Sequence, residues 1–174
     1  MIRTVDFLPD TFHTKTMKKY LTLISFIILC ELVGIAATPF TIEAISTWYI
    51  YLNKPFFSPP NWVFGPVWTI LYCLMGVAAY LVWTSKKKRS TVNRAFTIFV
   101  IQLACNFFWT ILFFALHAPL LAFIDIVVLL ALIAVNIQIF YAVHKHAGYL
   151  LVPYFAWVIF ATLLNLSIVL LNMN

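Results

Sequence analysis

Five long apolar runs, separated by short polar or proline-rich segments, set the pattern of the chain. They cover about residues 20–40, Asn61–Trp83, Ala95–Leu116, Pro119–Tyr141 and Tyr149–Leu171. An α-helix needs roughly 20 predominantly apolar residues to cross a bilayer. The pattern therefore predicts an all-α fold, an integral membrane bundle of five transmembrane helices.

The N-terminal segment lacks this pattern. Residues 1–18 are polar, mixed in charge and without apolar periodicity, which predicts a tail in the cytosol or on a surface, while residues 19–174 predict one membrane domain. A basic segment before an apolar run is also typical of a signal peptide. Because the run 20–40 is long and no small-residue cleavage site follows it, a retained helix is favoured.

Prolines mark the start of the second run. Pro55, Pro59 and Pro60 exclude a regular helix before about Asn61, because proline has no amide donor. Pro66 falls in the first turn of the run, where a missing donor costs little. The preceding segment carries amphipathic rings suited to a membrane–water interface, namely Trp48, Tyr49 and Tyr51.

Composition supports a membrane protein. The chain is 64% hydrophobic and 9% charged, with a mean hydropathy of +1.01, which is more apolar surface than a soluble domain of 174 residues can bury. Its net charge of +6 and pI of 9.3 do not indicate nucleic-acid binding, because the basic residues flank the apolar runs and form no basic helix.

The basic residues predict the orientation. On one side of the predicted bundle lie Arg3, Lys15, Lys18, Lys19, Lys86, Lys87, Lys88, Arg89, Arg94 and Lys145, and on the other lies Lys54 alone. The positive-inside rule then places the N-terminus in the cytosol and the Lys54–Asn61 loop outside, in a cell membrane of bacterial type. The run Lys86–Arg89 is favoured as a topology signal over a site for anionic lipid or a protein partner.

Motifs of classical enzymes are missing. The chain has no Gly-rich phosphate loop, GxSxG, CxxC or HExxH. His144 and His146 fall in a predicted turn, where loop polarity is favoured over metal or haem ligation, so no metal site and no obligatory cofactor are predicted. The three cysteines lie inside apolar runs, which favours small buried side chains over disulfides: Cys30, Cys73 and Cys105.

Several polar residues lie within the spans. Glu31 sits near the middle of the first span, where an unpaired carboxylate is costly, so it is expected to face the interior or to be protonated, either as neutral interhelical glue or as a functional group. In the third span Gln102, Asn106 and Trp109 share one helical face through their i, i+4, i+7 spacing. In the fourth span, Asp125 and Asn136 also share a face, because they are eleven residues apart.

Two more sets share a helical face: Gly65, Trp68 and Tyr72 in the second span, and Trp157, Ala161 and Leu164/Asn165 in the fifth. If these faces converge with Asn106, Trp109 and Asp125, they enclose an apolar cavity for a planar hydrophobic ligand. An equally supported alternative is that the aromatic residues only pack or anchor, and the amides only join helices.

The motifs together resemble the TspO/MBR family, the tryptophan-rich sensory proteins that include the mitochondrial translocator protein (the peripheral benzodiazepine receptor). The similarity runs from about residue 20 to 172. The residues that carry it are Trp48-Tyr49, Lys54-Pro55, Pro59-Pro60-x-Trp62, Gly65-Pro66-Val67-Trp68, Leu71-Tyr72, Gly76, Gln102-Leu103-x-x-Asn106-x-x-Trp109, Asp125 and Pro153-Tyr154-x-Ala156-Trp157-x-x-Phe160-Ala161-Thr162-x-Leu164-Asn165.

The resemblance implies five helices, a homodimer, and a cavity that the first loop closes and that takes porphyrins (protoporphyrin IX or haem-like) or synthetic aromatic ligands. Light-dependent porphyrin breakdown in some bacterial members implies a catalytic role for Trp68 and Trp157. Carried over by position, the ligand-binding residues are Phe64, Gly65, Val67, Trp68, Asn106, Trp109, Leu121, Ile124, Asp125, Val128, Trp157, Ala161 and Leu164.

Some positions depart from the family pattern. Phe57 stands where a tryptophan is usual, Leu121 replaces a large aromatic residue, and Thr110-Ile111 replaces prolines. The end of the last span lacks the tyrosine and basic residue of a proposed cholesterol motif. The leading hypothesis is a porphyrin-binding membrane protein, and the alternatives are a transporter of hydrophobic molecules and a regulatory protein that binds partners through residues 84–94.

Overall fold

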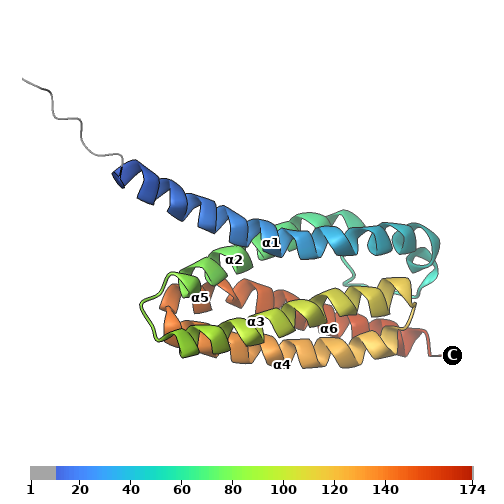
Figure 1. Cartoon of the computed structure of the whole chain (residues 1–174). Coiled ribbons are helices and arrows are strands. Elements are labelled where there is room, and N and C mark those ends of the chain that lie inside the picture. Colours follow the sequence, from blue (N-terminus) through green and yellow to red (C-terminus); the bar gives the residue numbers. More distant parts are fainter. Residues whose placement is uncertain (1–10, 174) are drawn as a thin grey trace, which may run out of the picture.

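The computed structural model describes residues 11–173, and helices are the only regular elements in this part of the chain (Figure 1). Short 3₁₀ turns and one π-helical turn connect or extend the α-helices. The elements are α1 (Thr11–Thr47), η1 (Tyr49–Tyr51), η2 (Asn61–Val63), α2 (Phe64–Trp83), α3 (Arg89–Thr110), the π-helical η3 (Ile111–Ala115), α4 (Pro119–Val143), α5 (Lys145–Leu150) and α6 (Val152–Leu171).

The five-span prediction is confirmed. Within the described residues, five helical stretches are long and apolar enough to cross a membrane. They are Thr16–Thr47, Asn61–Trp83, Arg89–Ala115, Pro119–Val143 and Lys145–Leu171.

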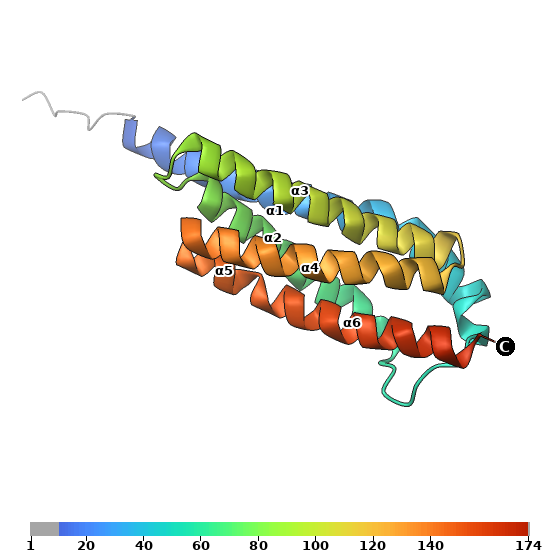
Figure 2. The same ribbon diagram turned by 90° about the horizontal axis from the view of Figure 1, so that it is seen from below.

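The first helix is longer than predicted. It begins at Thr11, inside the predicted tail, and continues through Pro39 to Thr47. Its first turns project past the other helices in both views (Figures 1 and 2). The rest of the predicted tail, residues 1–10, lies outside the described residues. The apolar run therefore marked only the middle of α1, because the helix extends into polar sequence on both sides.

The bundle has two distinct ends. At the basic end lie the start of α1, the α2–α3 loop and the junction of α4 with α5, and at the loop end lie residues 48–60 and the C-terminus of α6 (Figures 1 and 2). Helices α1, α3 and α6 run from the basic end to the loop end, whereas α2 and α4 run back. At the basic end, the Arg89 guanidinium lies 4.1 Å from the ring centroid of Trp83, a cation–π contact.

Glycines bring α1 and α2 close together. A Cβ atom built on Gly76 would lie 2.5 Å from the Cα atom of Ile27, and one built on Gly34 would lie 2.5 Å from Cε2 of the Tyr72 ring. Small residues allow this kind of close backbone approach between membrane helices. The absence of a side chain at these two positions therefore sets the spacing of α1 and α2.

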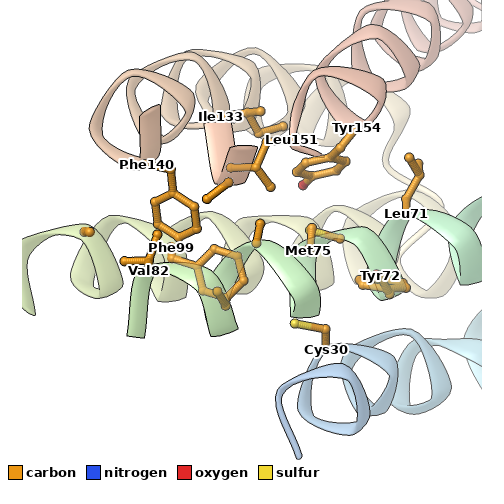
Figure 3. Packing of buried hydrophobic residues seen from close by; sticks show 14 of the residues in the cluster. Cys30, Leu71, Tyr72, Met75, Val82, Phe99, Ile133, Phe140, Leu151 and Tyr154 are labelled. Carbon is orange, nitrogen blue, oxygen red and sulfur yellow. The ribbon is translucent and has the colours of Figure 1, made fainter. Parts of the chain in front are cut away.

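A continuous apolar core joins the helices. Met75 of α2 and Tyr154 of α6 are fully buried in it, and Phe99 of α3 stacks on Phe140 of α4 with ring centroids 5.5 Å apart (Figure 3). Cys30 attaches α1 to the same core. A separate, smaller cluster contains Tyr49, Phe113, Ala122, Leu164 and Ile168.

The proline-rich segment docks on the end of α6, where it runs alongside the helix (Figure 2). The backbone N–H of Asn53 donates to Oδ1 of Asn172 at 3.0 Å, and Nδ2 of Asn172 donates to the Asn53 carbonyl at 3.0 Å. Phe57 packs edge-to-face on Phe160, with centroids 6.2 Å apart. Phe57, where the resemblance implies a tryptophan, thus packs against α6.

Replacing Asn172 with alanine is expected to loosen residues 52–60, because it removes both hydrogen bonds between the Asn172 side chain and the Asn53 backbone and leaves only the longer bond from Asn53 Nδ2 to the Leu171 carbonyl. Each such bond contributes about 1 kcal/mol. Hydrogen exchange in detergent should become faster at Asn53 while the helices stay protected. Ser167→Ala is the control, since its hydroxyl donates only within α6. Unchanged exchange at Asn53 in Asn172→Ala would contradict this role.

Candidate functional site

A cavity of about 350 Å³ lies within the bundle, bordered by α1, α2, the end of α3 with η3, and α6. Its size is within the range of small-molecule sites. Most of its lining is aliphatic or aromatic. The lining residues are Glu31, Gly34, Ile35, Ala37, Thr38, Thr41, Ile42, Ile45, Tyr49, Asn61, Phe64, Gly65, Trp68, Thr69, Tyr72, Asn106, Trp109, Thr110, Phe113, Phe114, Trp157, Ala161, Leu164, Asn165 and Ile168.

The direction in which each helix runs shows which lining residues are nearest each end of the bundle. Toward the basic end, the last lining residues are Glu31 of α1, Tyr72 of α2, Asn106 of α3 and Trp157 of α6, which we call the floor. The opposite end of the lining, toward the loop end of the bundle, includes Tyr49. We call this end of the cavity the mouth.

Hydrogen bonds tie the floor to the core. The Tyr72 hydroxyl donates to Oδ1 of Asn106 at 2.5 Å, and Nδ2 of Asn106 donates to the Tyr154 hydroxyl at 3.2 Å. That hydroxyl donates onward to Oε1 of Gln102 at 2.9 Å. Each of these polar side chains has a partner, which buried polar groups require. The network therefore fixes α2, α3 and α6 relative to one another beneath the cavity.

Aromatic rings form much of the wall. The Trp68 ring lies 5.5 Å from Tyr72 between centroids, and Phe64 packs edge-to-face on Trp157 at 5.9 Å. Trp109 stacks on Phe113 at 5.2 Å. These separations are typical of favourable ring pairs. The wall thus presents several fixed, flat surfaces toward the cavity.

Two indole N–H groups in the wall differ in whether they have a hydrogen-bond partner. Nε1 of Trp109 donates to Oδ1 of Asn165 at 3.0 Å, and Nδ2 of Asn165 donates to the Pro119 carbonyl at 2.9 Å. Nε1 of Trp157 is buried and has no hydrogen-bond partner among the described residues. An unsatisfied buried donor is costly, so Trp157 offers a free donor to a ligand.

The π-helical turn η3 extends the wall toward the mouth. It begins at Ile111, directly after Thr110, the two positions at which the resemblance implies prolines, and it places Phe113 and Phe114 in the lining. π-Helical turns are rare and often mark functional sites. After η3, His117 adopts a φ of 49° and stacks on Trp48 with centroids 4.4 Å apart.

A cation lies beside the mouth, outside the cavity lining. The Lys54 ammonium lies 4.4 Å from the centroid of the Tyr49 ring, a cation–π contact. Burial raises the pKa of the Tyr49 phenol, which moves its ionisation still further above physiological pH. Residues 52–60 do not line the cavity. The segment predicted to close the cavity therefore contributes its flanks, Tyr49 and Asn61, while its middle docks on α6.

The structure brings many of the predicted site residues together. Gln102 and Asn106 are buried, which confirms that their helical face points inward. Glu31 also faces the interior, although it makes no hydrogen bond to a described residue. The predicted ligand-binding residues that line the cavity are Phe64, Gly65, Trp68, Asn106, Trp109, Trp157, Ala161 and Leu164.

The predicted ligand-binding residues of the fourth span do not line the cavity. Leu121, Ile124 and Val128 are 53%, 57% and 50% exposed and point out of the bundle. Asp125 is half-buried, and its Oδ2 atom is buried without a hydrogen-bond partner in the described part of the chain. The cavity does not reach α4, which packs against α3, α5 and α6. Val67 packs on the core instead of the cavity.

Sequence reasoning missed the contribution of α1. Glu31, Gly34, Thr38, Thr41 and Ile45 all line the cavity. Their spacing alternates between three and four residues, which places them on one helical face. This spacing, together with small and polar residues in an otherwise bulky apolar run, is the sequence pattern that could have indicated a cavity-lining face on α1. Helix α1 therefore supplies the wall that the prediction gave to the fourth span.

The cysteines and the histidine pair lie outside the cavity lining. Cys30 is buried, Cys73 and Cys105 are half-buried, and all three are free thiols. The rings of His144 and His146 lie 5.6 Å apart, and no group of three potential metal ligands occurs in residues 11–173.

Comparison with known proteins gives one consistent result. The model of the TspO/MBR family matches residues 26–171. The tryptophan-rich protein TspO of Chlorobaculum tepidum is 43% identical over 89% of this chain and 98% of its own length, and that of Archaeoglobus fulgidus is 42% identical over 87% and 97%. The translocator protein of Homo sapiens is 38% identical over 68% of this chain and 70% of its own length. With five membrane-spanning helices and this extent of similarity, the chain belongs to the TspO/MBR family.

Proposed function

We propose that the protein binds a porphyrin, such as protoporphyrin IX, in the cavity between α1, α2, α3 and α6. The observation that carries the proposal is a wall of fixed aromatic rings that includes Trp68 and Trp157, of which Trp157 has a buried indole N–H with no partner in residues 11–173. Flat rings favour a flat apolar ligand, and a few polar groups in an apolar pocket orient it.

The charges favour one orientation of the porphyrin. Glu31 at the floor would repel the propionate groups, whereas Lys54, which lies over the Tyr49 ring beside the mouth, would attract them. The macrocycle then lies between the tryptophans with its carboxylates toward the loop end. If the N-terminus is cytosolic, as the positive-inside rule predicts, the mouth opens on the outer side of the membrane.

Quenching of tryptophan fluorescence by protoporphyrin IX in detergent tests this binding. We expect saturable quenching in the native protein and at least about tenfold weaker affinity in the double variant Trp68→Phe/Trp157→Phe, since the loss of two well-packed ring contacts costs about 1–3 kcal/mol. Trp62→Phe is the matched control, because Trp62 is 74% exposed and lies outside the cavity. Non-saturable quenching, or an equal affinity in the double variant, would refute the proposal.

A catalytic use of the site is a separate proposal. Trp68 and Trp157 both line the cavity and would contact the bound macrocycle. Illumination of the complex should then bleach the porphyrin absorbance faster in the native protein than in the double variant. Equal rates of bleaching in the two proteins would refute the proposed breakdown activity and would not affect the proposal of porphyrin binding.

A further inference from the structure

Glu31 is unlike every other residue of the cavity. It is the only residue with a charged side chain among the described residues that line it, and the lining contains no lysine, arginine or histidine. Its position on the floor puts it at the end of the cavity farthest from Lys54. The cavity therefore carries a carboxyl group at one end without a basic residue in its lining to pair with it.

The carboxyl group of Glu31 also has no hydrogen-bond or ion-pair partner within residues 11–173, although Tyr72 and Asn106 share the floor. Both of those side chains are already committed, because Tyr72 donates to Asn106 and Asn106 donates to Tyr154. Of the polar groups on the floor, the Tyr72 hydroxyl and the Asn106 amide are therefore paired within the described residues, whereas the Glu31 carboxyl group and the Trp157 indole N–H are not.

An unpaired carboxylate inside a membrane span is costly, and residues of this kind usually face a cavity and take part in function. A ligand cation would offset this cost by forming a charge-assisted hydrogen bond. The faces of Tyr72 and Trp157, which share the floor, would attract the same cation.

We propose that the cavity accepts a second class of ligand, planar hydrophobic amines whose protonated nitrogen pairs with Glu31 while their rings lie against Trp68 and Trp157. This inference uses the same cavity as the proposed porphyrin site but a different polar group. Porphyrin carboxylates are favoured at the mouth, and the ammonium group of an amine is favoured at the floor. The two ligand classes therefore compete for the aromatic wall.

A matched pair of probes tests this class: 9-aminoacridine, which is a cation near neutral pH, and acridine, which has the same three fused rings but is neutral. Affinities are measured by titration calorimetry in nonionic detergent at a pH slightly above neutral, with protein-free micelles as the blank. We expect the native protein to bind 9-aminoacridine at least about tenfold more tightly than acridine, because a bond between charged partners contributes more than a neutral contact.

Glu31→Gln keeps the size of the side chain and removes its charge. We expect it to lose about tenfold in affinity for 9-aminoacridine and to bind acridine unchanged, which also shows that the cavity is intact. Glu43→Gln is the control, because Glu43 lies on the same helix, is exposed and does not line the cavity. It should bind both probes as the native protein does.

Equal affinities of the native protein for the two probes, no binding of 9-aminoacridine, or unchanged binding of it in Glu31→Gln would each overturn the inference. Protoporphyrin titration of the same preparations separates this failure from that of the proposed function. Saturable protoporphyrin quenching without amine preference refutes only the role of Glu31. Absence of binding for all three compounds refutes both proposals.

Discussion

Gly76→Ala is expected to lower the free energy of unfolding by about 1–3 kcal/mol or more, the usual cost of overpacking. The added Cβ atom would lie 2.5 Å from the Cα and 2.8 Å from the backbone nitrogen of Ile27. These are backbone atoms, which cannot turn aside as the end of a flexible side chain can. The methyl group therefore forces α1 away from α2. Thermal unfolding in detergent, followed by circular dichroism, measures the loss.

Gly65→Ala is the matched control. Gly65 also lies in α2, but a Cβ atom built on it meets nothing within 4 Å. Alanine is favoured over glycine inside a helix, so the variant should be as stable as the native protein or slightly more stable. An equal loss of stability in the two variants, or no loss in Gly76→Ala, would contradict the close approach of α1 and α2.

Gly65→Phe is expected to abolish ligand binding without unfolding the protein. Gly65 lines the cavity and faces open space, so the ring can enter the cavity without displacing packed atoms. It would occupy part of the 350 Å³ cavity and so compete directly with a ligand for the space. We expect a loss of at least about 100-fold in affinity for protoporphyrin IX, equivalent to about 2.7 kcal/mol. Phenylalanine is chosen because it adds no tryptophan fluorescence to the quenching measurement.

Exposed positions on the other side of the bundle provide the control for this variant. Val128→Phe adds a similar ring on α4, where Val128 is 50% exposed and outside the cavity. It should bind protoporphyrin as the native protein does. If Val128→Phe weakened binding and Gly65→Phe did not, the ligand would lie against α4, as the family resemblance implies for Val128, and the cavity would be the wrong site.

The fold was largely predictable because a membrane constrains it. Spans of about 20 apolar residues identified all five helices, and the i, i+4, i+7 spacing of Gln102, Asn106 and Trp109 identified a face that is indeed turned inward. Both signals are local. They depend on the helix that carries the residue and not on which helix lies opposite.

The cavity was predictable only in part, since its borders depend on which helices are neighbours. Periodicity shows that Asp125 shares a face with Asn136, but not that this face looks away from the cavity. For the same reason, the polar and small residues of α1 could not be assigned to a wall until α1 was known to pack on α2. Glu31 has no hydrogen-bond partner among the described residues because its neighbours Tyr72 and Asn106 bond to each other and to Tyr154. This network spans three helices, so it could not be predicted from any one of them.

A structure of the protein with bound protoporphyrin IX tests the central claim most directly. We expect the macrocycle between Trp68 and Trp157, its propionate groups toward Lys54, and a ligand atom within hydrogen-bond distance of Nε1 of Trp157. A porphyrin bound on the lipid-facing side of α4 near Leu121 and Val128, with the cavity unoccupied, would contradict the account.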